Sequence, residues 1–223
     1  MTSPASTPDR RHATGTWPMI HAERAALAAD LAHLTDRQWA TRSLCDRLSV
    51  QQVLAHLTAG ASLGPARWMA GVIRCRFDFD RQVLMRLSEH LGDSPDDTLA
   101  RFRRVITSTT KPLLPTSAIL GEAVVHAEDI RGPLGVQHDY PIATLTALAD
   151  YYQGSNLPVQ TKARIRGLRL TATDGPFATG SGPLVTGGTL PLIMAMAGRA
   201  PYCDELDGEG VATLRARCAA NAG

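Results

Sequence analysis

Residues 116–131 read as one uninterrupted helix, and this stretch constrains the fold more than any other part of the chain. Prolines interrupt the sequence just before it, and Gly132-Pro133 is expected to end the helix after Arg131. Glu122 and His126 therefore stand in mid-helix, four residues apart. Positions i and i+4 share a helix face, so the carboxylate and the imidazole can converge on one metal ion.

His56 lies in a second predicted helix, and the start of that helix is the best marked boundary in the sequence. Ser49-Val-Gln-Gln52 matches a capping box, in which the first and last residues exchange hydrogen bonds with the backbone. Two histidines and one glutamate, with the rest of the coordination shell open, are the ligand set of a catalytic zinc site. The sequence thus predicts a metalloenzyme with His56, Glu122 and His126 as the metal ligands.

Each of these residues also has a simpler interpretation. A Glu-xxx-His pair is common on solvated helix faces, and His56 could be a core histidine bonded to a backbone carbonyl. Val124 and Val125, however, surround the pair with apolar neighbours. A buried carboxylate is costly unless a cation offsets its charge. On the residues alone, both interpretations remain open.

Two further residues near these motifs have more than one possible role. Asp129, three residues beyond His126, could orient a ligand imidazole or form a salt bridge with Arg131. Cys45 precedes a predicted helix start and is the cysteine best placed for a lowered pKa, but no basic partner is defined for it, so we interpret it as structural. The four cysteines show no CxxC spacing, which argues against a disulfide framework or a zinc knuckle and fits a reducing cytosol.

Composition excludes several classes of protein. The apolar fraction of 44% and the charged fraction of 20% are ordinary for a globular chain. A formal net charge of +2 gives no broad footprint for nucleic acid. The longest apolar run near the C-terminus, residues 190–197, is too short to span a bilayer. Residues 1–15 are expected to be a disordered tail and not a signal peptide, so we expect a cytoplasmic protein without nucleic-acid or membrane partners.

The helical pattern fills residues 16–157, and a different pattern follows in residues 158–223. Residues 164–173 alternate between polar and apolar side chains and read as a strand. Ser94 followed by Pro95 marks a further helix start. The other predicted elements are helices at 66–73, 142–153, 190–197 and 211–219 and a short strand at 184–186. We therefore expect a helical bundle followed by a small α/β domain.

An ordered series of motifs runs through nearly all of the chain after residue 15. The motifs are Trp39…Ser43-Leu-Cys45, Val53-Leu-Ala-His-Leu57, Phe77-Asp-Phe-Asp-Arg81, Gly121-Glu…His126-Ala-Glu-Asp-Ile-Arg…Pro-Leu-Gly135, Tyr152-Gln-Gly-Ser-Asn156, Gly167-Leu-Arg-Leu-Thr-Ala-Thr-Asp174, Ala197-Gly-Arg199 and Gly208-Glu-Gly-Val-Ala-Thr-Leu-Arg-Ala-Arg217. This series resembles the mycothiol-dependent maleylpyruvate isomerase family. The resemblance implies an α+β fold, with an N-terminal DinB-like four-helix bundle followed by a small α/β C-terminal domain.

The resemblance also implies a functional site. In this family the bundle binds a divalent metal, usually taken as zinc, through positions that match His56, Glu122 and His126. Arg199 matches an arginine implicated in catalysis, although it could also be a surface arginine after a helix. The sequence departs from the family where Gly132 stands in place of an arginine found in many relatives. That change puts identical substrate choice in doubt.

The expected activity follows from the metal and a small-molecule thiol. The resemblance names mycothiol as the thiol cosubstrate, and coordination would hold it as a nucleophilic thiolate. The thiolate would attack an electrophilic substrate, either in cis-trans isomerisation of a maleylpyruvate-like compound or in thiol S-transfer, with Arg199 holding a carboxylate. The alternative is a non-catalytic metal- or ligand-binding stress or regulatory protein on the same bundle. The oligomeric state is not predicted.

Overall fold

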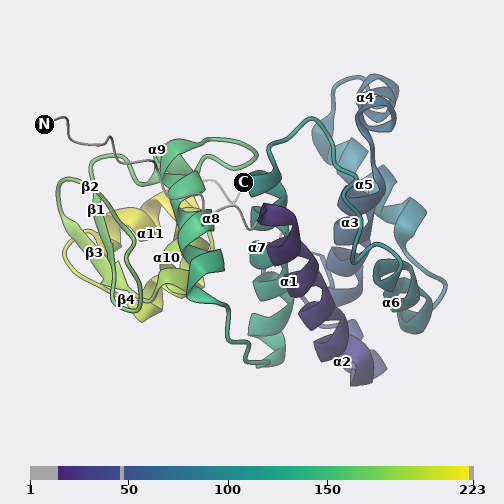
Figure 1. Ribbon diagram of the computed structural model, residues 1–223, viewed down its shortest axis with the longest axis horizontal. Coiled ribbons are helices and arrows are strands. Elements are labelled where there is room, and N and C mark those ends of the chain that lie inside the picture. Colours follow the sequence, from purple (N-terminus) through teal and green to yellow (C-terminus); the bar gives the residue numbers. More distant parts are fainter. Residues whose placement is uncertain (1–14, 46–47, 221–223) are drawn as a thin grey trace, which may run out of the picture.

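The computed structural model describes residues 15–45 and 48–220, so the predicted tail lies outside the described residues except for Gly15. The helices are α1 (Thr16–Asp30), η2 (Leu31–His33), α2 (Asp36–Trp39), α3 (Val50–Ser62), α4 (Pro65–Arg74), α5 (Phe79–His90), α6 (Pro95–Arg103), α7 (Thr116–Leu134), α8 (Ile142–Gly154), α9 (Thr161–Arg164), α10 (Thr189–Met196), η3 (Ala200–Glu205) and α11 (Val211–Ala219). The strands are β1 (Arg169–Ala172), β2 (Ala178–Gly180), β3 (Leu184–Gly187) and β4 (Leu206–Asp207). Figure 1 shows the helical half and the half that carries the sheet side by side.

Four helices that share one hydrophobic core, α1, α3, α6 and α7, form the bundle that the sequence predicts. α1 packs along α7, and α3 packs against both α6 and α7. Their shared core contains Leu27, Leu54, Phe102 and Ile130, each at most 1% exposed. α5 also packs along α3, and α4 packs against α5 (Figure 1). The fold class, a helical bundle followed by a small mixed domain, is therefore confirmed.

The predicted helix starts are confirmed by their hydrogen bonds. At the start of α3, the Gln52 amide donates to Ser49 Oγ at 3.3 Å, and the Ser49 amide donates to Gln52 Oε1 at 2.9 Å. At the start of α6, the Asp97 amide donates to Ser94 Oγ at 3.1 Å. These bonds satisfy amides that have no partner within the helix. They fix where α3 begins and hence where His56 stands.

The predicted end of α7 is wrong. The helix continues through Pro133 to Leu134 and ends at Gly135, which has the left-handed backbone conformation with φ 66°. Proline lacks an N–H, so it leaves the carbonyl of Asp129, four residues earlier, without a helical donor. The amide of Leu44 supplies that donor at 3.0 Å. A contact from a distant segment thus allows the helix to pass through a proline.

The sheet has the strand order β2-β1-β3-β4. β1 and β3 are parallel, with Leu170 opposite Val185, whereas β1–β2 and β3–β4 are antiparallel. The strand predicted from residue 164 is wrong in its first half, because Arg164 ends α9 and a turn through Gly167, with φ 72°, follows. Left-handed backbone at Gly167 interrupts an extended chain, so β1 begins only at Arg169. The strand β2 was not predicted.

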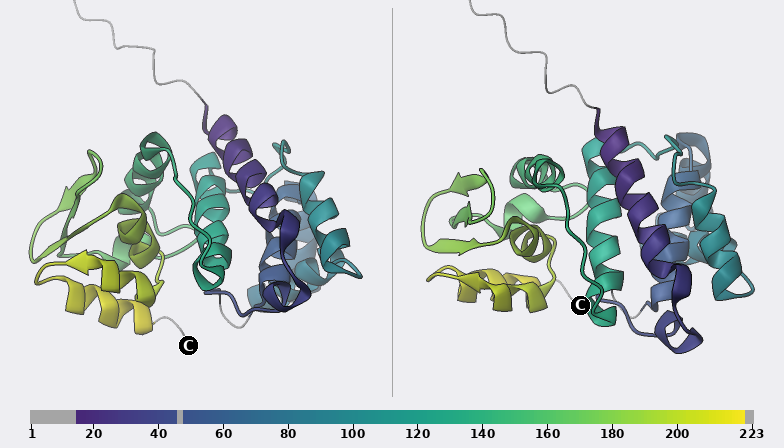
Figure 2. Two further views of the ribbon diagram at one scale, coloured as in Figure 1. Left: turned by 90° about the horizontal axis from the view of Figure 1, so that it is seen from below. Right: turned by 60° about the horizontal axis from the view of Figure 1, so that its bottom comes forward.

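A second hydrophobic core joins the sheet half to the bundle. α8 and α10 lie between the sheet and α7 (Figures 1 and 2), and Leu148 and Leu192 are fully buried there. The same core includes Leu120 of α7 and Val185 of β3. It is therefore continuous across residue 157, where the sequence predicts a domain boundary.

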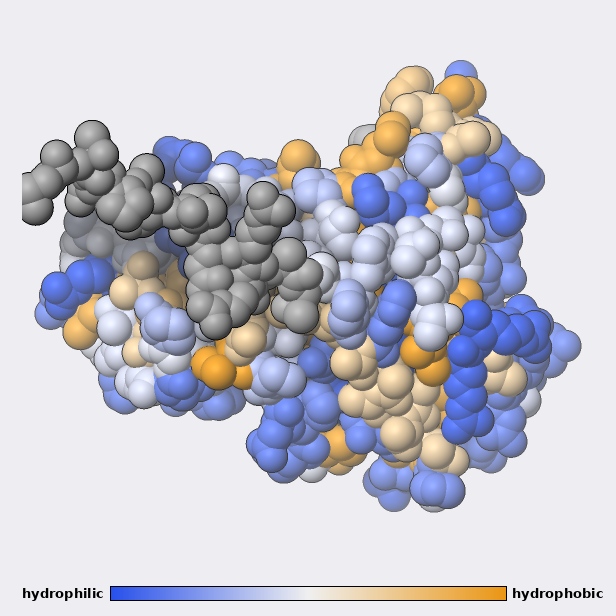
Figure 3. All heavy atoms as spheres, viewed as in Figure 1, coloured by the Kyte–Doolittle hydropathy of each residue, from blue (hydrophilic) through white to orange (hydrophobic). Residues whose placement is uncertain are grey.

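Large apolar side chains are exposed at α4 and just after it. Apolar side chains gather over α4 and the turn after it (Figure 3), where Met69, Ile73 and Phe77 are 40%, 62% and 68% exposed. Within residues 15–45 and 48–220, no helix combines the length and the apolar character needed to cross a bilayer.

Candidate metal centre

The structure brings the three predicted ligands together. Nε2 of His56 lies 3.4 Å from Oε2 of Glu122, and Nε2 of His126 lies 3.3 Å from the same oxygen. The two imidazole rings meet edge to face, with their centroids 4.9 Å apart. One ligand atom from each residue thus lies within 4.8 Å of the other two. α3 supplies one histidine, and one face of α7 supplies the other two groups.

The centre is open on one side. The side chains of His56, Glu122 and His126 are 22%, 31% and 12% exposed, respectively. A structural zinc site is closed by four protein ligands, whereas a catalytic site has three and leaves a position for an exogenous ligand. The number of donors and their partial exposure fit the second kind of site.

Asp129 holds the ring of His126 in place. Its Oδ2 lies 2.8 Å from Nδ1 of His126, and its side chain is fully buried. If Nδ1 carries the proton, the lone pair of Nε2 faces Glu122, as a metal ligand requires. The alternative pairing with Arg131 does not occur, because Arg131 pairs with Asp30 at 2.6 Å. Asp129 therefore orients the imidazole.

Arg199 lies beside this pair and is anchored by it. Its Nε donates to Oδ1 of Asp129 at 2.9 Å, its Nη2 donates to Oδ2 at 2.5 Å, and its Nη1 donates to the carbonyl of Ala197 at 2.9 Å. These bonds use three of the five guanidinium N–H groups. Burial alone would lower the pKa of Arg199, but the hydrogen bonds and charge of Asp129 raise it, so the side chain stays charged.

The electrostatics of the centre favour positive charge. Burial would raise the pKa of Glu122, but the charge of His126 and the hydrogen bonds from His126 and His56 hold it well below its usual range. Burial would lower the pKa of His126, but Glu122 and Asp129 raise it well above its ordinary value. Two carboxylates thus surround one imidazole. A divalent cation would meet a ready set of donors here.

Cys45, for which the sequence defines no basic partner, lies beside the candidate centre in the structure. Its Sγ lies within 4.8 Å of an imidazole nitrogen of His126, so it has a basic neighbour. The amide of Leu44, which bonds to the carbonyl of Asp129, brings Cys45 to this position. The sequence signal was Pro133, whose missing N–H creates that acceptor.

Cys45, His126 and Asp129 form a second possible donor set that overlaps the first. Asp129 is fully buried, and Arg199 already occupies both of its oxygens. A metal there would have to displace a buried ion pair, which costs several kcal/mol. The set of His56, Glu122 and His126 is the better candidate.

Tyr152 was not singled out as a site residue. It is 3% exposed, and a Cβ atom on Gly121 would stand 2.5 Å from its phenol oxygen. Burial raises its pKa, and the charge of Glu122 raises it further, while Arg199 acts in the opposite direction. The phenol therefore stays protonated beside the candidate ligands. In the sequence, Gly121 directly before Glu122 is the feature that indicates a bulky neighbour at this position.

Two comparisons relate the chain to known proteins, and no curated protein matches it. Residues 20–116 match the family described as "Mycothiol maleylpyruvate isomerase N-terminal domain", a span that includes His56 but ends before Glu122. The solved mycothiol-dependent maleylpyruvate isomerase is 13% identical, with a TM-score of 0.53, and a histidine-to-alanine mutant of it is 12% identical, with a TM-score of 0.56. Each alignment covers 87% of this chain and 91% of the solved one. Residues 20–116 therefore match the N-terminal domain of this family, and the chain as a whole shares the fold of the solved isomerase.

Proposed function

We propose that this protein is a metal-dependent enzyme that uses mycothiol to attack an electrophilic small molecule. The observation that carries the proposal is the convergence of His56, Glu122 and His126 on one partly exposed point, with Arg199 beside it. The solved relatives with this fold are mycothiol-dependent isomerases, which supports the choice of thiol.

The three convergent side chains would hold a divalent ion, and zinc suits their nitrogen and oxygen donors. When bound, the metal would lower the pKa of a coordinated thiol and so present it as a thiolate at neutral pH. Asp129 would keep the ring of His126 aligned for this role. The partial exposure of the three side chains leaves room for the thiol and the substrate.

Arg199 would bind the electrophile. After its bonds to Asp129 and Ala197, two N–H groups of the guanidinium remain. They can donate to a carboxylate of an unsaturated acid and stabilise the negative charge that develops when a nucleophile adds to the double bond. The protonated phenol of Tyr152 can serve as a further donor at the same place.

Two outcomes are possible once the carbon–sulfur bond has formed. In isomerisation, the former double bond rotates as a single bond, the carbon–sulfur bond breaks, and the thiol is returned with the trans product. In S-transfer, the enolate takes up a proton from solvent, which balances the proton that the thiol lost, and the product keeps the carbon–sulfur bond. The names of the solved relatives favour isomerisation of maleylpyruvate, and we take that as the first substrate to test.

The test is turnover of maleylpyruvate by the zinc-loaded protein with and without mycothiol, with the product identified by NMR. We expect activity that depends on both, its loss in Glu122→Ala, and a reduction of roughly 100-fold in Arg199→Lys, because lysine cannot form the paired bonds. Arg215→Lys, at an exposed ion pair with Asp204, is the matched control. Metal binding without thiol-dependent turnover of any electrophile would favour the non-catalytic alternative, and full activity in Glu122→Ala would refute the proposed site.

A further inference from the structure

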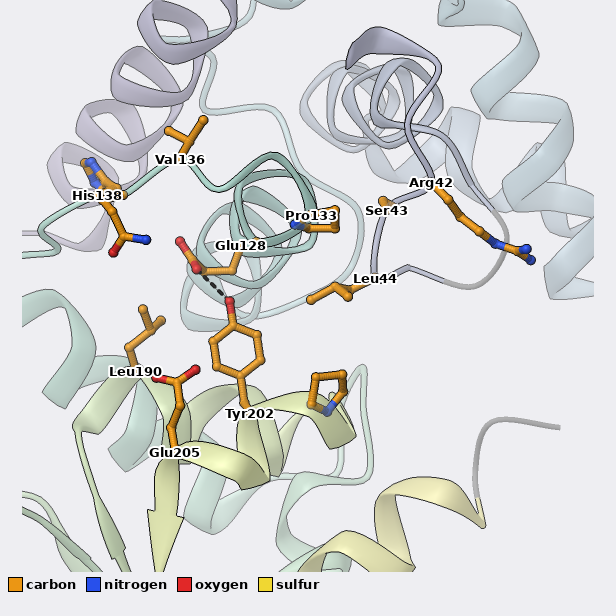
Figure 4. A pocket seen from close by; sticks show the side chains of 13 residues that line it. Arg42, Ser43, Leu44, Glu128, Pro133, Val136, His138, Leu190, Tyr202 and Glu205 are labelled. Carbon is orange, nitrogen blue, oxygen red and sulfur yellow. Dashed lines mark hydrogen bonds between the residues drawn. The ribbon is translucent and has the colours of Figure 1, made fainter. Parts of the chain in front are cut away.

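A separate cavity of about 620 Å³ lies where the C-terminal half of α7 faces η3 (Figure 4). Its volume is in the range of sites that hold small molecules. Glu128 and Gly132 line it from α7, and Tyr202 and Glu205 line it from η3. The residues that line this cavity do not include His56, Glu122 or His126.

Glu128 brings a buried negative charge to this cavity. Its side chain points towards Tyr202 (Figure 4), and the residue is only 7% exposed. Its two oxygens accept hydrogen bonds from two neutral phenols, Tyr140 at 2.7 Å and Tyr202 at 2.8 Å. The guanidinium of Arg131 is committed to Asp30 and to Tyr140. Glu128 is therefore hydrogen-bonded but makes no direct ion pair within the described residues.

Glu205 adds a second carboxylate to the lining of the cavity. It is exposed, its carboxylate lies on the same side as Leu190 (Figure 4), and no hydrogen bond to it is present within the described residues. Burial raises the pKa of Glu205, and the charge of Glu128 raises it further, so the two carboxylates act on each other. Two like charges that face one space are unfavourable unless a cation lies between them.

The basic groups around the cavity do not supply that cation. The guanidinium of Arg42 extends away from the Glu128–Tyr202 pair (Figure 4). His138 is paired with Glu23 at 3.0 Å. Among the described residues that line the cavity, Arg42 and His138 are the basic ones, and neither contacts Glu128 or Glu205 through a hydrogen bond.

We propose that this cavity binds a small primary ammonium ion with a short apolar chain. The ammonium would lie between Glu128 and Glu205, where its three N–H groups meet carboxylate oxygens that have free lone pairs. The chain would lie against apolar walls formed by Leu44, Val136 and Leu190. This site goes beyond the proposed function and does not depend on it.

The first test uses the wild-type chain and three probes of one length: hexylammonium, hexan-1-ol and hexanoate. Amide shifts in a two-dimensional NMR titration at neutral pH give both the affinity and the location. We expect hexylammonium to bind about tenfold more tightly than hexan-1-ol, with hexanoate weakest, and the shifts to centre on Gly132, Val136 and Leu190. Equal binding of the alcohol or the carboxylate, or shifts centred elsewhere, would overturn the proposal.

Variants test the two carboxylates separately. Glu128→Gln should weaken hexylammonium binding about tenfold and Glu205→Gln about threefold, because the second is more exposed. Glu209→Gln, an exposed glutamate outside the cavity lining, should leave it unchanged. His56→Ala should also bind normally, so a failure of the metal site and a failure of this site can be told apart. Unchanged binding in both cavity variants would refute the proposal.

Gly132 offers a test that does not remove a buried group. A Cβ at this position would have its nearest contacts at 3.4 Å, to Leu44 Cδ1 and the Tyr202 hydroxyl, so a side chain can be accommodated. Gly132→Lys would place a tethered ammonium in the cavity, whereas Gly132→Gln would add similar volume without charge. We expect the lysine variant to melt at a higher temperature than the glutamine variant and to lose hexylammonium binding. Equal melting temperatures would count against an ammonium site.

Discussion

Nδ1 of His126 lies 2.8 Å from Oδ2 of Asp129, one turn further along α7. Asp129 is itself held by two hydrogen bonds from Arg199, which reaches it from the segment after α10. The orientation of a candidate metal ligand on the bundle is thus set by a carboxylate that the C-terminal part of the chain anchors. Metal affinity should therefore respond to a residue that does not touch the metal.

Asp129→Asn tests this relationship. The amide oxygen can still accept a hydrogen bond from His126, but it carries no charge, so the imidazole becomes a weaker ligand. We expect zinc affinity to fall by about 10- to 100-fold in competition with a chromophoric chelator. Asp150→Asn, exposed on α8, is the control. If both variants fold and bind zinc as tightly as the wild type, Asp129 has no part in positioning the ligand.

Gly121 should tolerate no side chain, because Tyr152 occupies the space. The phenol oxygen lies 2.5 Å from where a Cβ would stand, so Gly121→Ala must displace a buried aromatic ring. We expect the free energy of unfolding to fall by about 1–3 kcal/mol in urea denaturation. In a Tyr152→Phe background the penalty should be smaller, because the clashing oxygen is gone.

Gly60 provides the matched control for this prediction. It lies in α3 with nothing within 4 Å of its missing Cβ. Gly60→Ala should therefore stabilise the protein by about 0.5–1 kcal/mol, since alanine loses less conformational entropy in a helix. A loss of stability at both glycines would mean that helix packing, and not the Tyr152 contact, explains the first result.

Glu205 should make stability depend on pH in a defined direction. Burial, and then the charges of Glu128 and Asp204, raise its pKa above the ordinary 4.5. The folded state therefore holds the proton more tightly than the unfolded state. The protonated side chain contributes to the free energy of unfolding at low pH, and this stabilisation is lost as pH rises from 4.5 through the folded pKa. At neutral pH, Glu205→Gln should be more stable than the wild type in urea denaturation, and the difference should shrink towards pH 4.5. A difference that does not change with pH would contradict the assignment.

Cys45 should be the first thiol to react with a disulfide reagent in the folded protein. It is half-buried, whereas Cys75, Cys203 and Cys218 are at most 2% exposed. Zinc should slow this reaction, because Sγ of Cys45 lies within 4.8 Å of an imidazole nitrogen of His126, a candidate metal ligand. Cys45→Ser should remove the fast phase but keep the metal, and Cys75→Ser should change neither. Loss of metal in Cys45→Ser would move the site to the set of Cys45, His126 and Asp129.

Short sequence motifs correctly predicted those parts of the fold that depend on interactions between residues close together in the chain. The capping box at Ser49 and the N-cap at Ser94 involve residues three apart, and the structure contains both. Helix geometry places Glu122 and His126 on one face of α7. The packing of α3 on α7 then brings His56 close to them. The binding of a metal there remains a prediction.

Features that depend on distant contacts were not predictable from the sequence. α7 passes through Pro133 because Leu44, almost ninety positions earlier, satisfies the carbonyl that the proline leaves free. The same contact brings Cys45 to His126. The cavity beside Glu128 depends on how η3 faces α7, and the spacing of residues along the chain contains no information on that.

The most direct test of the account is the metal content of the purified protein, beside His56→Ala and the matched variant His33→Ala. His33 is exposed on η2, so its loss should not affect the centre. Elemental analysis should find about one divalent metal per chain in the wild type and in His33→Ala, and none in His56→Ala. A wild-type protein that stays free of metal after reconstitution with excess zinc would contradict the account.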